Sequence, residues 1–264
     1  MLATDFNLGS TFLRVARAHG DRPALVLPGR SVTYAELAQT AADWAATAIG
    51  AEPEVTPLIG VLACRSLPAY AGIWAALIAG RGYLPLNPAH PVARTRQMLE
   101  SSGSRVVIVG AEGLALLDTL ADAPQPYTFL LADQTDASKW HRKFPQHRFI
   151  ASPHFLRNGA LPDDVTVDDA AIAYLLFTSG STGEPKGVAV THANVASYTR
   201  YITERHGITE QDRFSQMPDL TFDLSIQDLF PCWTRGAALH VVPRKATFSP
   251  ATFIREHDIT IWTS

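Results

Sequence analysis

Small and hydroxylated side chains collect in one short segment of the sequence, directly after an apolar run. Residues 174–188 read YLLFTSGSTGEPKGV, which contains three glycines, four serines or threonines and one lysine. Glycines allow backbone angles that direct successive N–H groups at one anion, and hydroxyl and ammonium groups add further donors. The segment therefore predicts a loop that binds the phosphate groups of a nucleotide. Its expected contacts are Thr178, Ser179, Gly180, Ser181, Thr182, Gly183 and Lys186.

Spacing separates this segment from two better-known loops. A P-loop of the form G-x-x-x-x-G-K-[ST] would need glycine at position 185 and serine or threonine at 187, where the chain has proline and glycine. The G-x-S-x-G elbow of serine hydrolases is excluded as well, because Ser181 lacks that flanking spacing. A flexible surface turn rich in small residues is the alternative to a phosphate loop.

A second candidate for chemistry is a carboxylate inside an apolar segment. Asp223 lies in TFDLSIQDLF, residues 221–230, with Phe222, Leu224 and Ile226 close to it in sequence. A carboxylate in such surroundings needs a cation, and the α-ammonium group of an amino acid would supply one. Leaving a buried charge unpaired costs about 3–5 kcal/mol, so a fatty or aryl acid would be rejected by roughly a hundredfold or more. The alternative is that Asp223 caps the helix that follows it.

Apolar patterns along the chain predict the elements that must position these residues. Short strand-like runs alternate with longer helical ones, which argues for a mostly parallel sheet covered on both faces and hence an α/β fold. Thr33 and Glu36 have the spacing of a capping box that opens the first predicted helix. Strands are expected at residues 58–63, 83–88, 105–110, 127–132, 171–177 and 237–243, and residues 258–264 also look like a strand. Helices are expected within residues 31–49 and at 67–80, 92–103, 113–122 and 192–207.

Periodicity fades between residues 133 and 169, where the sequence is polar and broken by prolines. We expect a long surface connection there. Its run KWHRKFPQHR, residues 139–148, mixes basic and aromatic side chains, which nucleic-acid-binding proteins also do. A single short basic run in a mildly acidic chain is more typical of a solvated face.

Composition limits the class of partner. The chain has 264 residues, is 47% hydrophobic and carries a formal net charge of -3, so neither nucleic acid nor a membrane surface is indicated as a partner. The most apolar stretch, residues 69–80, is too short to span a bilayer. The two cysteines are far apart in the sequence and indicate neither a disulfide framework nor a zinc site, which fits a reducing cytoplasm. His141, His147 and His154 lack the spacing of metal ligands.

Several segments resemble one enzyme superfamily. TSGSTGEPKGV is similar to the signature of the adenylate-forming, or AMP-binding, enzymes, which include acyl-CoA synthetases, luciferases and the adenylation domains of nonribosomal peptide synthetases. VTYAEL at 32–37, LIAGRGYLPLNPAHP at 77–91 and TFDLSIQDLF resemble further motifs of amino-acid adenylation domains. The resemblance implies that Thr178, Ser179 and the loop amides contact ATP, and that Lys186 lies near the departing pyrophosphate.

The same resemblance implies a substrate pocket around Asp223. Amino-acid-activating members carry aspartate in an FD-x-S pattern that acyl-CoA synthetases usually lack, and this chain reads FDLS at 222–225. Phe222, Leu224 and Gln227 would line the pocket beside it. Asp-Leu-Gln resembles the opening of some proline-selective pockets, whereas FDLSIQDLFPCW with IWTS resembles D-alanyl carrier protein ligases. Three positions leave the amino acid undecided.

The implied reaction is the ATP-dependent conversion of an amino acid to an aminoacyl adenylate with release of pyrophosphate, and Mg²⁺ is expected with ATP. The acyl group would then pass to the phosphopantetheine thiol of a carrier protein. Family members place an adenine-binding segment and the principal catalytic lysine after the region matched here. Residues 1–264 are therefore expected to be the N-terminal part of an adenylation domain. The second half of the large domain and the C-terminal lid domain are expected to be absent from it, and with them the catalytic lysine. The chain alone is therefore expected to be inactive or nearly so. The alternatives are a non-catalytic nucleotide-binding or interaction fragment and an acyl-CoA synthetase.

Overall fold

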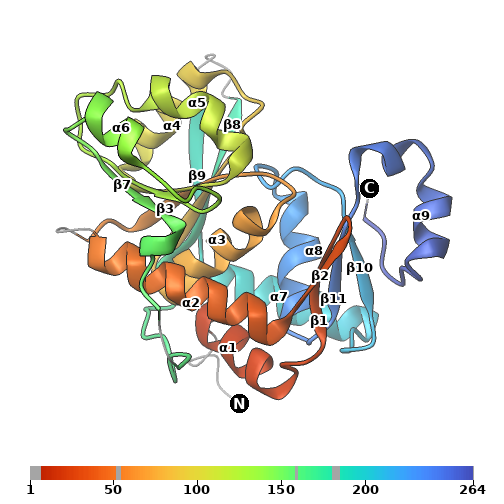
Figure 1. The fold of residues 1–264 in the computed structure, drawn as a ribbon. Helices are drawn as coiled ribbons and strands as arrows, with labels where there is room; N and C mark the ends of the chain where they lie inside the picture. Colours follow the sequence, from red (N-terminus) through yellow and green to blue (C-terminus); the bar gives the residue numbers. More distant parts are fainter. Residues whose placement is uncertain (1–6, 52–54, 158–159, 180–184, 264) are drawn as a thin grey trace.

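The fold is given by a computed structural model that describes residues 7–51, 55–157, 160–179 and 185–263 (Figure 1). Two sheets and the helices around them make up the described chain. The mixed α/β architecture confirms the predicted fold class, and the strands are mostly parallel.

The larger sheet has seven strands in the order β7-β6-β5-β3-β4-β8-β9. All neighbouring pairs are parallel except the last, because β8 and β9 form an antiparallel hairpin. The strand predictions at 58–63, 83–88, 105–110, 127–132 and 171–177 are confirmed, while β9 was not expected. The strands are β3 (Leu58–Leu62), β4 (Gly82–Leu86), β5 (Val106–Val109), β6 (Thr128–Leu131), β7 (Arg148–Ala151), β8 (Ile172–Ser179) and β9 (Pro185–Thr191).

The smaller sheet has four strands in the order β10-β11-β1-β2. β1 and β2 form an antiparallel hairpin near the amino terminus, and β11 pairs in parallel with both β1 and β10. Residues separated by about two hundred positions in the sequence therefore share one sheet. The strands are β1 (Pro23–Leu27), β2 (Arg30–Thr33), β10 (Arg213–Gln216) and β11 (Ala238–Val241).

Helices cover both faces of the larger sheet, as alternation along its strands requires. Ile59 and Val61 of β3 pack into one apolar core, whereas Leu58 and Leu62 pack into a second core on the opposite face. The first core receives α1, α2, α3 and α8, and the second receives α4, α5 and α6. The α-helices are α1 (Leu8–Ala18), α2 (Tyr34–Ala51), α3 (Leu67–Ile78), α4 (Val92–Ser102), α5 (Leu114–Leu120), α6 (Ser138–Lys143), α7 (His192–His206), α8 (Leu224–Trp233) and α9 (Pro250–Glu256). Short 3-10 turns are η1 (Ala111–Gly113), η2 (Ser152–His154) and η3 (Arg244–Phe248).

α3 is buried along its whole length and lies between the two sheets (Figure 1). The Trp74 ring stacks on Phe12 of α1, with ring centroids 3.9 Å apart, and meets Trp233 of α8 edge-on at 5.4 Å. Gly72 permits this close approach, because a Cβ there would lie 2.9 Å from a methyl group of Val61 in β3. No helix of the described chain is long and apolar enough to cross a membrane.

The capping box at the start of α2 is confirmed. The Thr33 amide donates to Glu36 Oε2 at 2.9 Å, and the Glu36 amide donates to Thr33 Oγ1 at 3.2 Å. These two bonds satisfy backbone donors that the first turn of a helix leaves free.

Residues 133–169 are not the continuous surface connection expected from the sequence. They contribute α6 and the edge strand β7, and Trp140, Phe144 and Phe149 are buried against the second core. Both elements are short, so their few apolar residues do not produce a recognisable period. The aromatic residues of the basic run face inward while Lys143 pairs with Asp118 at 2.8 Å, which gives the run a structural role.

The C-terminal segment is not a strand in the described residues. It makes a single bridge between Ile261 and Phe214 on the free edge of β10. The Ser215 amide donates to the Ile261 carbonyl at 2.9 Å, and the Ile261 amide donates to the Arg213 carbonyl at 3.1 Å. The Thr260 amide also donates to the Arg213 carbonyl at 2.9 Å, and the Thr263 amide donates to Ser215 Oγ at 3.2 Å, so residues 260–263 follow the edge of β10.

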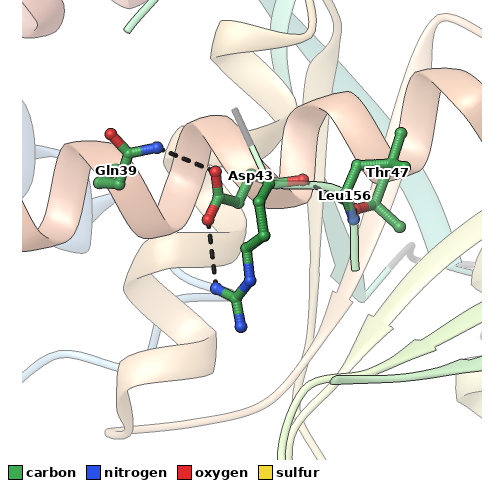
Figure 2. Close-up of polar contacts among 5 residues, drawn as sticks. Gln39, Asp43, Thr47 and Leu156 are labelled. Carbon is green, nitrogen blue, oxygen red and sulfur yellow. Dashed lines mark hydrogen bonds and ion pairs between the residues drawn. The ribbon is translucent and has the colours of Figure 1, made fainter. Parts of the chain in front are cut away.

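A buried carboxylate in α2 anchors the chain after β7 (Figure 2). Asp43, which is 3% exposed, accepts hydrogen bonds from Gln39 Nε2 at 2.9 Å and from Arg157 Nη1 at 3.2 Å. One turn along, Thr47 Oγ1 accepts the Leu156 amide at 2.8 Å. These polar contacts fix the path of residues 155–157 over α2.

A second buried carboxylate, Asp228 in α8, is fully buried, and neither of its oxygens has a hydrogen-bond partner among the described residues. Burial raises its pKa to about 7, although the nearby Thr263 hydroxyl and Met217 amide act in the opposite direction. The carboxyl group is thus protonated in the folded chain over a pH range in which an unfolded chain would ionise it.

We expect Arg157→Ala to lower the free energy of unfolding by about 1–2 kcal/mol, because the buried Asp43 carboxylate loses a charged hydrogen-bond donor. The effect is limited because the arginine is exposed, so water can partly replace it as a donor to Asp43. Urea unfolding of the variant measures this. Arg142→Ala on α6, where the arginine is exposed, is the control and should change stability by less than about 0.5 kcal/mol. Equal effects of the two substitutions would show that the Asp43 contact does not anchor the segment.

Asp228→Asn should change how stability depends on pH. The folded pKa lies above the unfolded value, so the stabilising contribution of Asp228 is complete below about pH 4 and is lost as the pH rises to about 7. The asparagine variant should gain a few kcal/mol relative to the parent chain over that range, as an order of magnitude. Denaturant titrations at several pH values compare the two, with Asp122→Asn, an exposed carboxylate, as control. A pH-independent difference would contradict the raised pKa.

Candidate functional site

A cavity of about 480 Å³ opens at the carboxyl ends of the central strands. Residues of β8 and β9 form its floor, the segment before α8 forms one wall, and the start of α4 forms another. Ligands of open parallel sheets bind at this edge, where loops from adjacent strands meet. The lining side chains used below are His90, Arg94, Tyr174, Thr178, Thr221, Phe222 and Asp223.

The floor brings together two of the predicted phosphate contacts. Thr178 at the end of β8 pairs directly with Lys186 near the start of β9, and its hydroxyl donates to the Lys186 carbonyl at 3.4 Å. Side chains of directly paired strand residues project from the same face of a sheet. Tyr174 pairs with Val190 and both line the cavity, so the alternation along the hairpin places Thr178 and Lys186 on the same strand face, although Lys186 is not itself among the lining residues.

The remaining predicted phosphate contacts are only partly described. Ser179 ends β8 and pairs with Pro185. The predicted contacts Gly180, Ser181, Thr182 and Gly183 lie outside the described residues.

Asp223 lines the opposite wall of the cavity, but it is exposed and not buried among apolar side chains as its neighbours in the sequence suggested. Phe222 and Leu224 are 63% and 41% exposed, because the buried face of α8 begins at Ser225. The capping alternative is not observed either, since the Asp223 side chain makes no cap hydrogen bond. Its negative charge affects the cavity, because burial, and to a smaller extent the charge of Asp223, raise the pKa of Tyr174 to about 12.

The other predicted substrate contacts divide into two groups. Phe222 lines the cavity together with Asp223, whereas Leu224 and Gln227 are not among its lining residues. Gln227 lies one turn after Asp223, and its Oε1 accepts a hydrogen bond from Tyr198 of α7 at 3.4 Å. Leu224 and Gln227 therefore lie outside the lining of this cavity.

Sequence reasoning missed His90, Arg94 and Tyr174. The first two follow β4, and they reach the cavity because β4 lies beside β8 in the sheet. The side-chain amide of Asn87 donates a hydrogen bond to the Asp219 carboxylate, and this bond joins the loop after β4 to the segment before α8. The order of strands in the sheet, which the sequence does not reveal, is the missing information.

Other parts of the described chain offer weaker candidates. A larger hollow of about 990 Å³ lies at the amino ends of β5, β6 and β7 and contains none of the predicted site residues. Its His147 is engaged at both ring nitrogens, with the Tyr127 amide at 3.1 Å and the Ala121 carbonyl at 2.7 Å. No group of three or more His, Cys, Asp or Glu side chains in the described chain could hold a metal ion.

The chain matches the family described as AMP-binding enzyme over residues 12–264. It is 34% identical over 203 residues to an L-proline–[L-prolyl-carrier protein] ligase of Pseudomonas fluorescens, a match that covers 76% of this chain and 38% of the ligase. Among solved structures it is similar to the adenylation domain AlmE of Vibrio cholerae in complex with glycyl-adenosine-5'-phosphate, with 29% identity, a TM-score of 0.86, and coverage of 98% of this chain and 49% of that one.

A second similar structure is that of the nonribosomal peptide synthetase FmoA3 with AMPPNP bound, at 31% identity and a TM-score of 0.79. The match covers 97% of this chain and 25% of FmoA3, so the chain spans less than half the length of each of these three relatives. The family match extends over nearly the whole sequence, and the similarity to solved adenylation-domain structures shows that the fold agrees with it. The chain belongs to the family of AMP-binding enzymes.

Proposed function

We propose that this chain is the N-terminal part of an adenylation domain that activates an amino acid as an aminoacyl adenylate. The observation that carries the proposal is the placement of Asp223 on one wall of a cavity that Thr178 also lines, while Lys186 pairs with Thr178 on the adjacent strand. A cation-binding carboxylate and a phosphate-binding lysine then face the same space. That combination fits the two reactants, an amino acid with its α-ammonium group and ATP.

In the proposed reaction, a carboxylate oxygen of the amino acid attacks the α-phosphorus of ATP. A bond forms between that oxygen and phosphorus, and the bond between the α- and β-phosphates breaks to release pyrophosphate. The contribution of this chain is to position the reactants and to neutralise charge. Lys186 and Thr178 would hold the phosphates, and Asp223 would orient the amino group so that the carboxylate points toward them.

Mg²⁺ is proposed as the companion of ATP. Enzymes that bind magnesium with a nucleotide hold it with one or two carboxylates and with phosphate oxygens. Asp223 is the carboxylate among the described residues that line the cavity, and it is assigned to the amino group of the substrate, so the phosphate oxygens would supply most of the ligands of the ion.

A carrier protein is the proposed acceptor of the activated acyl group, through a phosphopantetheine thiol. The similarity to a ligase named for its prolyl-carrier protein supports this partner. We also propose a cytoplasmic location, because Cys64 and Cys232 are both free thiols and cellular ATP is the expected substrate.

Amino-acid-dependent exchange of labelled pyrophosphate into ATP tests the reaction. The panel should include proline, D-alanine and L-alanine, and binding of each compound to the same chain should be measured by calorimetry. We expect the chain to bind reactants but to exchange slowly or not at all, because the proposal makes it one part of an adenylation domain. Exchange with one amino acid would confirm the activity and overturn the requirement for a further part.

Asp223→Ala should remove the preference for an amino group. The parent chain is expected to bind an amino acid about 10–100-fold more tightly than the matching acid without the amine, which is the value of a charge-assisted hydrogen bond. The variant should bind the two compounds equally and keep its affinity for ATP. If the parent chain already binds propanoate as tightly as alanine, the amino-acid assignment is wrong and an acyl substrate is favoured.

Lys186→Ala should weaken the binding of ATP by about tenfold or more and the binding of AMP much less, because the lysine is expected to contact the outer phosphates. Amino-acid binding should not change. Lys139→Ala is the matched control, since that lysine lies over the Trp140 ring on α6, away from the cavity lining. Equal weakening of ATP and AMP would place Lys186 away from the pyrophosphate.

A further inference from the structure

The wall of the cavity opposite Asp223 carries an arginine that the proposed reaction has not used. Arg94 lies in the first turn of α4, just after the carboxyl end of β4. Tyr83 of β4 pairs with Tyr174 of β8 in a parallel register, so β4 and β8 end side by side. The start of α4 is therefore held next to the strand end that carries Thr178.

Arg94 has no evident structural partner in the described part of the chain. Its Nε is buried without a hydrogen-bond partner, and the described residues form no ion pair with its guanidinium group. Arg96, two positions along the same helix, also has a buried Nε without a partner, but it differs because its Nη2 donates to the Thr119 carbonyl. A buried donor that is left without an acceptor destabilises a fold, so it calls for a ligand.

The position of Arg94 at the start of its helix also favours a bound anion. The first turn of a helix carries a partial positive charge, which disfavours a cation and favours an anion. α4 also begins without a side-chain cap, because Pro91 occupies that position. An anion bound at this wall would compensate both the arginine and the helix dipole.

Neighbouring groups leave Arg94 as the source of positive charge at this wall. His90 also lines the cavity, and its Nδ1 is buried without a partner in the described residues. Burial and then Arg94 lower the pKa of His90, so its ring is neutral at pH 7 and can donate or accept one hydrogen bond. Asp219 is already bonded to the Asn87 amide and to the amide and hydroxyl of Thr221.

We propose that Arg94, assisted by the His90 ring beside it in the lining, binds an oxyanion of the reactants inside this cavity. A guanidinium group is planar and matches a carboxylate or a phosphate with two parallel hydrogen bonds. The oxyanion is either the carboxylate of the amino acid, whose ammonium group would face Asp223, or a phosphate of the nucleotide. This inference rests on the proposed function for the identity of the reactants, but the binding of an oxyanion can be tested by itself.

The test compares Arg94→Ala and Arg94→Lys with Arg96→Ala in calorimetric binding to the 264-residue chain. The probes are alanine against ethylamine, ATP against adenosine, and inorganic pyrophosphate. Arg94→Ala should weaken the binding of the probes that carry the bound oxyanion by about 10–100-fold and leave the binding of ethylamine and adenosine unchanged. Arg94→Lys should recover part of the loss, and Arg96→Ala should bind every probe like the parent chain.

The pattern of losses distinguishes the two oxyanions. Weaker binding of alanine alone would show that Arg94 binds the carboxylate of the amino acid. Weaker binding of ATP and pyrophosphate would show that Arg94 binds a phosphate. Unchanged affinity for all oxyanions, in a parent chain that binds them, overturns the inference and leaves the proposed function intact. Failure of the parent chain to bind any probe contradicts the proposed function itself.

Thermal unfolding tests the inference without a ligand. If Arg94 is an unpartnered cation at a helix start, Arg94→Ala should leave the Tm unchanged or raise it. A fall of several degrees, with Arg96→Ala as the reference, would show that Arg94 has a structural partner, and it would overturn the inference even if no probe binds.

Discussion

The structure depends on burying one helix, α3, completely. Its residues from Pro68 to Ile78 are all buried, and the Trp74 ring is held between Phe12 of α1 and Trp233 of α8. A helix that is apolar all round cannot stay at a surface, so elements far apart in the sequence must pack around it. The absence of a side chain at Gly72 lets α3 approach β3 closely and fixes the distance between the helix and the sheet.

Packing around α3 also brings the parts of the candidate site together. α3 connects β3 to β4, and it holds α8 through the aromatic contacts of Trp74. Arg65, in the loop between β3 and α3, donates to the Val242 and Met217 carbonyls, each at 2.5 Å, and so ties the ends of both sheets. The carboxyl ends of β4 and β8 and the segment before α8 consequently meet at one cavity, each contributing a different charge or hydroxyl.

Much of the fold could be predicted because its signals are local. The alternation of strands and helices, the capping box at Thr33 and the buried character of residues 67–80 follow from side-chain type and spacing, and the structure confirms them. The predictions failed where signals were weak. α6 and β7 are too short to show a period, and residues 260–263 follow the edge of β10 with one bridge, at Ile261, instead of forming a strand.

Residue type and order are enough to establish which chemical groups this protein can offer, namely the glycines, hydroxyls and Lys186 of one short segment and the acid Asp223. Which of these residues share a cavity follows from the packing of distant segments. Asp223 proved to be exposed on a cavity wall, and Arg94 joined it from a segment about 130 positions earlier, since β4 lies beside β8. The order of strands in a sheet depends on contacts between distant segments, and no local pattern encodes it.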